Sequence, residues 1–468
     1  MSRLDRFFEI TARGSTVGAE IRGGLVTFIA MAYIIVLNPI ILAGPEDVAG
    51  NQLQFAQVSA VTALTAGVMT ILFGVIARLP FAFAAGLGIN SFLATSVVGT
   101  LTWPEAMGLV VINGLIIVAL AVSGLRRLVF DAVPMELKIA ITAGIGLFIL
   151  FIGLVDAGFV GSTGLPSPPV GLGEAGRGSI TSIPTLVFVV TLLLTGILVA
   201  RRVRGGILIG LIGGTALAAA IEAIWHLGSS VDNPGGWRLS VPTLSGSPFA
   251  LPDLSLVGAF SMDSFGRIGA LAALVLVFTL VFANFFDALG TLTGLSRQAG
   301  LAASDGTFPR LRAALIVEGA GAVAGGASSS SSNTVFIESG AGIEEGARTG
   351  LANLVTGALF LAAMFVSPLA SVVPTEVAAA ALVIVGAMMF SHLRHIDISE
   401  FSVALPVVLT VAVMPLSYSI ANGIGVGFVS WVVLQSVSGK ARAVSPLLWF
   451  VAAGFLLYFA RDVIAPVA

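Results

Sequence analysis

Apolar runs separated by short polar segments extend over most of the chain. Many are roughly 20 residues long, the length that an α-helix needs to cross the hydrocarbon core of a bilayer. The pattern predicts an all-α polytopic membrane protein with about fourteen transmembrane segments. The predicted spans are residues 19–42 with an interruption at 38–39, 55–77, a third that opens at 80, 107–124, 133–155, 183–200, 205–227 and 268–295, followed by spans that begin near 313, 328, 349, 376, 401 and 421.

Two of these segments contain sequence that breaks a helix. One is glycine-rich, from Ala84 to Phe92, and the other, from Ser328 to Gly342, begins with five serines. Backbone within the hydrocarbon core must hydrogen-bond inside the protein, so irregular backbone persists there only where protein or a water-filled cavity shields it. We therefore predict half-helices that border a binding site in the third and tenth spans. The same two segments can also contain short antiparallel strands.

The two halves of the chain share a pattern. Val133–Glu136 opens the fifth predicted span with the same Val-Pro-X-Glu letters with which Val373–Glu376 opens the twelfth, and the helix breaks fall at matching places. An odd number of spans separates the two copies, so they have opposite orientations. Inverted repeats with broken helices at matching positions indicate an alternating-access transporter with its site at the repeat interface.

Basic residues fall on alternate loops. If the N-terminus is cytoplasmic, so are the loops that contain Arg78, Arg201 and Lys440, whereas the loops between them carry few Lys or Arg. Cytoplasmic loops are the ones enriched in these residues. The N-terminus also lacks the apolar region and cleavage site of a signal peptide. We expect a multi-pass protein of the inner or plasma membrane with its N-terminus in the cytoplasm.

Composition narrows the chemistry further. The formal net charge of the 468 residues is only −2, which gives no basic face for nucleic acid. The absence of cysteine excludes disulfides and thiolate chemistry, and three histidines leave little material for a metal site, so neither a metal nor a cofactor is expected. The sequence contains neither a GxxxxGK[ST] phosphate loop nor a G-x-S-x-G elbow, so ATP-driven pumping by this chain and an α/β-hydrolase lack support.

Two carboxylates at membrane depth are the main functional candidates. Asp287 lies deep in the eighth predicted span and Glu338 follows the serine run. Ionisable side chains there are costly and mark functional sites by default. We expect both to face one cavity and accept N–H groups of a ligand. Because like charges repel, one of the two is expected to hold or sense a proton and couple transport to it. The alternative for Asp287 is pairing with a neighbouring helix.

Other side chains complete this predicted site. Unpaired amides at half-helix starts near Asn90 and Ile337 would suit carbonyl or anionic groups. The Asn90 amide can contact the ligand or cap the break, and nearby phenylalanines can stack on a planar ring or simply pack. Glu318 is instead expected near the inner surface, paired with an arginine. The candidate substrate-binding residues are Asn90, Ser91, Phe92, Asn284, Phe286, Asp287, Thr291, Phe336, Ile337 and Glu338.

Five stretches, in order along the chain, resemble the azaguanine-resistance type guanine/hypoxanthine (purine) permeases of the nucleobase transporter superfamily. They are TFIAMAYII at 27–35 with NP at 38–39, GLGIN at 86–90, FDALGTL at 286–292, IES at 337–339 with GARTGL at 346–351, and YSIANG at 418–423. The resemblance implies a proton-coupled purine importer with two inverted seven-span repeats. It also implies that Asn90, the acidic positions of the eighth span and Glu338 hold the purine.

The resemblance divides the chain into a moving core domain and a gate domain. Where the family commonly has a first aspartate in the eighth span, this sequence has Asn284, which can hydrogen-bond but cannot titrate; Ala85 replaces a proline and Phe336 a tyrosine. Base preference and proton stoichiometry therefore stay open. The implied parts are a cytoplasmic tail 1–18, core spans 19–127 and 263–370, gate spans 128–227 and 371–438, an extracytoplasmic loop 228–262 and a C-terminal segment 439–468 that is apolar over 446–464.

The sequence thus predicts a secondary active transporter that imports hypoxanthine or guanine, or adenine, with a proton. Its partners would be the purine, protons and the lipid bilayer, and a homodimer is compatible with this prediction. The alternatives are a uracil or xanthine permease, or an anion transporter of the same architecture; an anion site would need a buried cation, and no Lys or Arg lies beside the breaks. A channel, or a membrane enzyme using Asp287 and Glu338, would be a different class.

Overall fold

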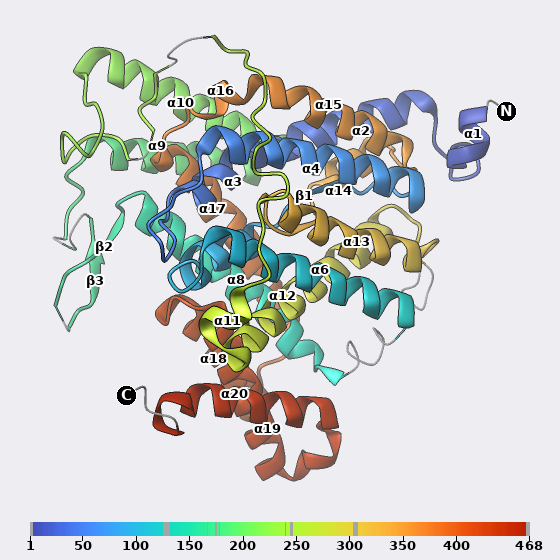
Figure 1. Cartoon of the computed structure of the whole chain (residues 1–468). Coiled ribbons are helices and arrows are strands. Elements are labelled where there is room, and N and C mark those ends of the chain that lie inside the picture. The colour runs from blue at the N-terminus through green and yellow to red at the C-terminus, as the bar shows by residue number, and fades with distance from the viewer. Residues whose placement is uncertain are drawn as a thin grey trace.

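Helices make up most of the structure, a computed structural model (Figure 1). It describes residues 3–124, 132–165, 167–173, 176, 178–238, 240–243, 247–302 and 308–464, without the side chains of 286, 289, 290 and 461–464. Over this part, nine helical segments are long and apolar enough to cross a membrane. The prediction of a mostly helical polytopic membrane protein is confirmed, while the larger number of spans stays a prediction.

The elements alternate between long apolar helices and short irregular pieces. In chain order they are α1 (Arg3–Phe8), α2 (Val17–Met31), α3 (Ile34–Ala43), α4 (Phe55–Ile76), β1 (Phe83–Ala85), α5 (Leu87–Phe92) with a π-helical turn (Leu93–Val97), α6 (Trp103–Ser123), α8 (Met135–Asp156), β2 (Val160–Ser162), β3 (Val170–Leu172), α9 (Ile183–Ala200), α10 (Gly206–Trp225), α11 (Ser264–Ile268), α12 (Ala270–Gln298), α13 (Leu311–Ala327), β4 (Asn333–Val335), α14 (Ser339–Glu344), α15 (Leu351–Ala363), α16 (Ser367–Ala370), α17 (Thr375–Phe390), α18 (Phe401–Leu416), α19 (Ile420–Gln435) and α20 (Pro446–Ile464).

The first span is interrupted at Ala32–Tyr33, between α2 and α3, and the predicted interruption at Asn38–Pro39 is wrong. Pro39 lies inside α3. A proline has no N–H for the carbonyl four residues earlier, which here belongs to Ile35. The Ser59 hydroxyl of α4 donates to that carbonyl at 3.2 Å. The helix therefore continues through the proline because a neighbouring side chain satisfies the exposed acceptor.

Both predicted half-helices are present, and each is a three-residue strand followed by a six-residue helix. The strands β1 and β4 pair antiparallel, in agreement with the short antiparallel strands expected in these segments, and Ala84 lies opposite Thr334. The helix α5 begins at Leu87, three residues before Asn90, and α14 begins at Ser339, two residues after Ile337, so both start near the expected positions. Gly86 separates β1 from α5, and the serine run 328–332 precedes β4.

Side chains complete the hydrogen bonding of this two-stranded ladder in the apolar interior. The Phe83 N–H donates to the Thr70 hydroxyl of α4 at 2.9 Å. Beside it, the Ala82 N–H donates to the Ser339 hydroxyl at 2.9 Å. A strand edge that faced lipid would leave such amides unpaired, at a cost of several kcal/mol each, roughly. The polar residues of α4 and α14 therefore explain how strands persist between apolar helices.

The long helices pack around this ladder in pairs. Helix α4 contacts α15, α6 contacts α13, and α8 contacts α17. In the last pair a Cβ added to Gly386 would lie 2.5 Å from the Gly146 carbonyl oxygen, so glycine permits the close approach. Helices α9 and α10 lie at one end of the molecule and α18 to α20 at the other (Figure 1). The apolar C-terminal segment forms α20, which packs against α19.

Candidate functional site

The carboxylate at the second half-helix is held by a tyrosine from the first span. Glu338 immediately precedes α14 and is partly accessible. The Tyr33 hydroxyl donates to Glu338 Oε1 at 2.6 Å, and Tyr33 is fully buried. Tyr33, at the junction of α2 and α3, thus contacts the residue that immediately precedes α14. Sequence analysis missed Tyr33, although a tyrosine in an apolar span, one of only three in the chain, is an available signal.

The second predicted carboxylate, Asp287, projects from the middle of α12. It is partly accessible and interacts electrostatically with Glu338. No hydrogen bond from the described residues reaches its carboxyl group. The structure therefore brings Asp287 and Glu338 into each other's electrostatic field, and both remain open to a ligand.

A third acid, Glu318, was misplaced by the sequence analysis. It is only 1% exposed, deep on α13, and not at the inner surface. The Thr334 hydroxyl of β4 donates to Glu318 Oε1 at 2.5 Å, while Oε2 has no partner among the described residues. The predicted arginine partner is wrong. Because α13 begins at Leu311, Glu318 lies two turns into the helix, about 10 Å from its start.

Glu318 also interacts electrostatically with Asp287. The three acids nevertheless do not form a metal site, since no three His, Cys, Asp or Glu side chains in the described ranges are placed to hold an ion. The arrangement is a chain of carboxyl groups that runs from α13 past α12 to the start of α14. Such a chain can accept N–H donors and hold protons.

Asn90 of the first half-helix is fully buried in an amide network. Its Nδ2 donates to Asn38 Oδ1 at 2.5 Å, and Asn38 Nδ2 donates to Thr62 Oγ1 at 2.7 Å and to the Ser330 carbonyl at 3.1 Å. These bonds join α5, α3, α4 and the serine run. The contacts of Asn90 are with this network and not with the carboxylates.

Asn284 stands one turn before Asp287 on α12 and is also buried. Its Nδ2 donates to the Ser332 hydroxyl at 3.0 Å, and its Oδ1 has no partner in the described part of the chain. Residues three apart on a helix share a face. Asn284 therefore links the face that carries Asp287 to the serine run before β4.

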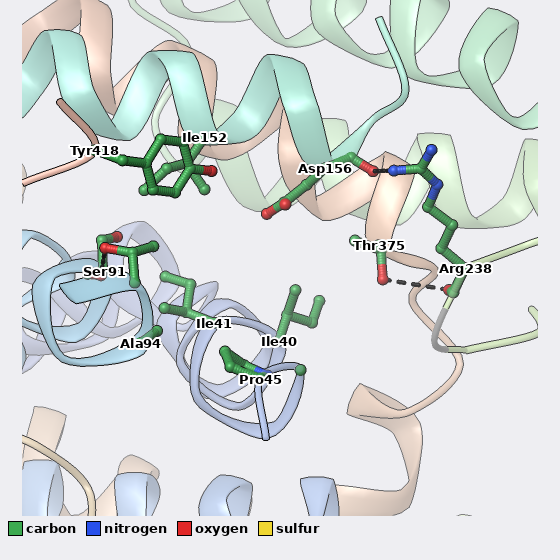
Figure 2. Close-up of a pocket in the computed structure, with 12 residues that line it drawn as sticks. Ile40, Ile41, Pro45, Ser91, Ala94, Ile152, Asp156, Arg238, Thr375 and Tyr418 are labelled. Atoms are coloured by element: carbon green, nitrogen blue, oxygen red, sulfur yellow. Dashed lines mark hydrogen bonds between the residues drawn. The ribbon is translucent and has the colours of Figure 1, made fainter. Parts of the chain in front are cut away.

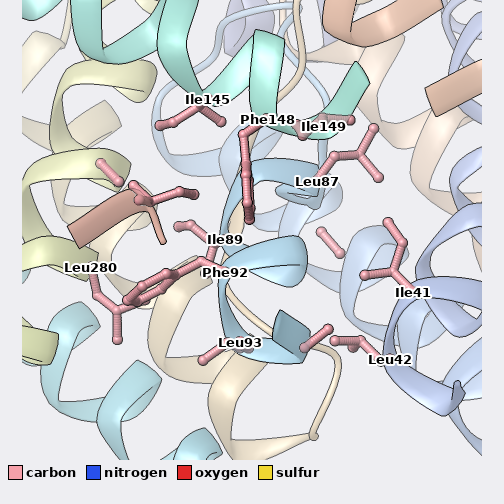
Figure 3. Packing of buried hydrophobic residues seen from close by; sticks show 14 of the residues in the cluster. Ile41, Leu42, Leu87, Ile89, Phe92, Leu93, Ile145, Phe148, Ile149 and Leu280 are labelled. Atoms are coloured by element: carbon pink, nitrogen blue, oxygen red, sulfur yellow. The ribbon is translucent and has the colours of Figure 1, made fainter. Parts of the chain in front are cut away.

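The remaining candidates have different surroundings. Phe92 lies beside Leu280 of α12, in the buried apolar cluster that also contains Ile145 and Phe148 of α8, which is ordinary core packing (Figure 3). Phe336 is buried, whereas Ile337 is 50% exposed beside Glu338. Three candidates remain: Ser91 is buried, Thr291 is partly accessible, and the side chain of Phe286 lies outside the described part.

The profile of the Permease family (Xan_ur_permease) matches residues 18–459. The chain belongs to the Permease family. This makes it a transporter rather than an enzyme, in agreement with the sequence analysis. The resemblance to purine permeases is also confirmed: the Guanine/hypoxanthine permease PbuG of Bacillus subtilis (strain 168) is 39% identical over 464 residues, which are 97% of this chain and 99% of the relative.

Other relatives carry different names. The Adenine permease AdeP of Escherichia coli (strain K12) is 34% identical over 456 residues, covering 97% of this chain and 95% of the relative. Among solved structures, the transmembrane domain of a cyanobacterium bicarbonate transporter, BicA, superposes with a TM-score of 0.62 at 15% identity, over 86% of this chain and 97% of that chain. At that identity the likeness concerns the fold alone.

Proposed function

We propose that this permease imports a purine base, hypoxanthine or guanine, together with a proton. The observation that carries the proposal is the pair Asp287 and Glu338, partly accessible and electrostatically linked. Full-length relatives named guanine/hypoxanthine permeases support the substrate class. A permease of this length with two open carboxylates is suited to a small ring that presents N–H donors.

The two carboxylates have different roles in this proposal. Tyr33 occupies Oε1 of Glu338, which orients the group and leaves the other oxygen for a ring N–H. Asp287 has no hydrogen bond from the described residues and accepts a second N–H or carries the proton. Repulsion between the two acids disfavours ionising both, so a proton bound at one stabilises the pair. Asn284 and the exposed Ile337 border the ring.

Alternating access is the proposed mode of transport, in which core spans 19–127 and 263–370 move against gate spans 128–227 and 371–438. The packing supports an inverted repeat of about fourteen spans. The α4–α15 contact has its counterpart in α6–α13, the α9–α17 contact has its counterpart in α18–α8, and α8–α17 would lie on the axis. We place the N-terminus in the cytoplasm and the protein in the inner or plasma membrane.

Uptake of labelled bases tests this function. Cells that express the permease should accumulate radiolabelled hypoxanthine and guanine more strongly than uracil or xanthine, and an uncoupler should abolish the accumulation. The AdeP relative makes adenine the second candidate, because this chain is 34% identical to it. Uptake that survives the uncoupler would contradict proton symport. A preference for uracil would contradict a purine substrate, and a preference for xanthine would contradict hypoxanthine and guanine as the preferred purines.

A further inference from the structure

A pocket of about 300 Å³ opens at the C-terminal end of α8, and neither Asp287 nor Glu338 lines it (Figure 2). One wall comes from α3, α5 and the π-helical turn, and the other from α8, the start of α17 and the segment before α19. It therefore lies between elements of the proposed core and gate. Its volume falls at the lower end of the range of small-molecule sites, roughly 300–1,000 Å³.

Polar groups without hydrogen-bond partners face this pocket. The Asp156 carboxylate points into the hollow, across from the Tyr418 hydroxyl (Figure 2). The two interact electrostatically, yet no hydrogen bond within the described ranges reaches either group. Ser91 on the core side is 1% exposed, and its hydroxyl lacks a partner in the same part of the chain. Of the three, only Ser91 is buried, whereas Asp156 is partly accessible and Tyr418 is 38% exposed. A buried hydroxyl is normally paired, so the unpaired Ser91 hydroxyl, with two accessible polar groups across the same cavity, indicates a ligand that pairs with them.

The wall behind Asp156 is fixed by its neighbours. Arg238 Nη1 donates to the Val155 and Asp156 carbonyls at 3.2 and 3.3 Å, which caps the end of α8. The Thr375 hydroxyl donates in turn to the Arg238 carbonyl at 3.2 Å. These bonds fix the main chain that carries the Asp156 carboxylate, and the Arg238 charge attracts that carboxylate. Such preorganisation lowers the cost of binding.

Tyr418 is held from both sides of the pocket. The Ser96 hydroxyl of the π-helical turn donates to the Tyr418 carbonyl at 3.0 Å. The Tyr418 ring meets Phe148 edge to face, with ring centroids 5.7 Å apart. Its hydroxyl is thus positioned opposite Asp156, with Ile40 and Ile152 forming apolar walls between them.

We propose that this pocket is a second binding site for a purine base, reached before the Asp287 and Glu338 site. A ring N–H donates to the Asp156 carboxylate, a ring nitrogen or carbonyl accepts from Tyr418 or Ser91, and the flat faces lie between the isoleucines. The pocket is the outer one if the N-terminus is cytoplasmic. The inference rests on the proposed function for its ligand and its side of the membrane.

Transport from the two sides of the membrane tests the site. Asp156→Asn and Tyr418→Phe should each raise the KM for hypoxanthine entering intact cells about fivefold, the loss of one hydrogen bond. The KM measured from the other side, in inside-out vesicles, should change less. The matched control is Asp232→Asn, an exposed acid of the adjoining loop that does not line the pocket, with no expected change. An unchanged KM in intact cells, or equal changes from both sides, overturns the proposal.

Equilibrium binding separates this inference from the proposed function. In purified protein with Asp287→Asn and Glu338→Gln combined, labelled hypoxanthine should still bind at one weak site, and adding Asp156→Asn should remove it. Because this measurement does not require transport, it tests the second binding site even if the protein shows no hypoxanthine uptake. Binding that is absent from the double variant, while wild type binds, refutes the second site. Tyr418→Phe keeps the ring and serves as the variant that preserves packing.

Discussion

The two half-helices have the same architecture and different chemistry. Each is a strand of three residues that leads into a helix of six, and the strands pair with each other. Around α5 the side chains are buried and Asn90 is bonded to Asn38. Around α14, Glu338 and Ile337 remain accessible, and a tyrosine orients the acid. In the proposed function the second arm, β4 with α14, therefore contacts the ligand at the carboxylate site through Glu338. In the first arm, β1 with α5, Asn90 holds the structure together and Ser91 faces the outer pocket.

Removing the acid of the second arm should have the largest effect. Glu338→Gln should lower initial hypoxanthine uptake at least about 50-fold, because a charged acceptor for a ring N–H and for Tyr33 is lost. Uptake is measured per amount of protein in the membrane. Glu344→Gln, an exposed acid of the same helix, is the matched control and should transport normally. Full uptake by Glu338→Gln would remove this residue from the site.

Substitution of Asp287 on α12 should remove proton coupling while the base still binds. Asp287→Asn should abolish accumulation of hypoxanthine while cells preloaded with the base still exchange it for labelled base, since the amide binds a ring but holds no transported proton. Asp287→Glu should restore part of the accumulation. Concentrative, uncoupler-sensitive uptake by Asp287→Asn would show that the proton is carried elsewhere, with Glu318 as the next group to examine.

Substitution in the first arm should reduce stability more than affinity. Asn90→Ala leaves Asn38 Oδ1 buried without its donor, which should cost about 1–3 kcal/mol of folding free energy. The expected result is a lower melting temperature in detergent with little change in the KM for hypoxanthine. Thr100→Ala, exposed beyond the same segment, is the control. A large rise in KM at an unchanged melting temperature would break the comparison, because Asn90 would then contact the ligand.

The smallest expected effect comes from adding an acid beside Asp287. Asn284→Asp places a second carboxyl group one turn away on the same face of α12. Repulsion should make the pair retain its proton to higher pH, so the pH profile of uptake should move toward alkaline values. The measurement is initial uptake between pH 5 and 9, roughly, where shifts of one unit are resolved. An unchanged profile would exclude Asn284 from the proton-binding group.

The sequence predicted features that depend on local pattern. Span lengths followed from apolar runs, and both half-helices followed from Gly86 and the serine run. The antiparallel pairing of β1 with β4 agrees with the short antiparallel strands expected in these segments. Asp287 and Glu338 were identified because charge is rare among apolar residues, and the structure places them in one electrostatic neighbourhood.

What sequence analysis missed depends on which way a side chain faces. Helices that are apolar all round give no periodic signal for their buried face. Glu318 was therefore placed at a surface instead of against Thr334, and the role of Tyr33 was not foreseen. Pro39 was taken as an interruption because the Ser59 hydroxyl that satisfies the Ile35 carbonyl is on another helix. The pocket at Asp156 joins six separate segments, which no local pattern reveals.

The ladder between β1 and β4 fixes the two arms to each other at Ala84 and Thr334. Main-chain hydrogen bonds join the two strands. Neither arm can slide past the other without breaking these bonds, and the hydrocarbon core offers no other hydrogen-bond partners. If transport proceeds by the proposed alternating access, the two arms move together as one unit, and the relative motion takes place between this unit and the helices around it.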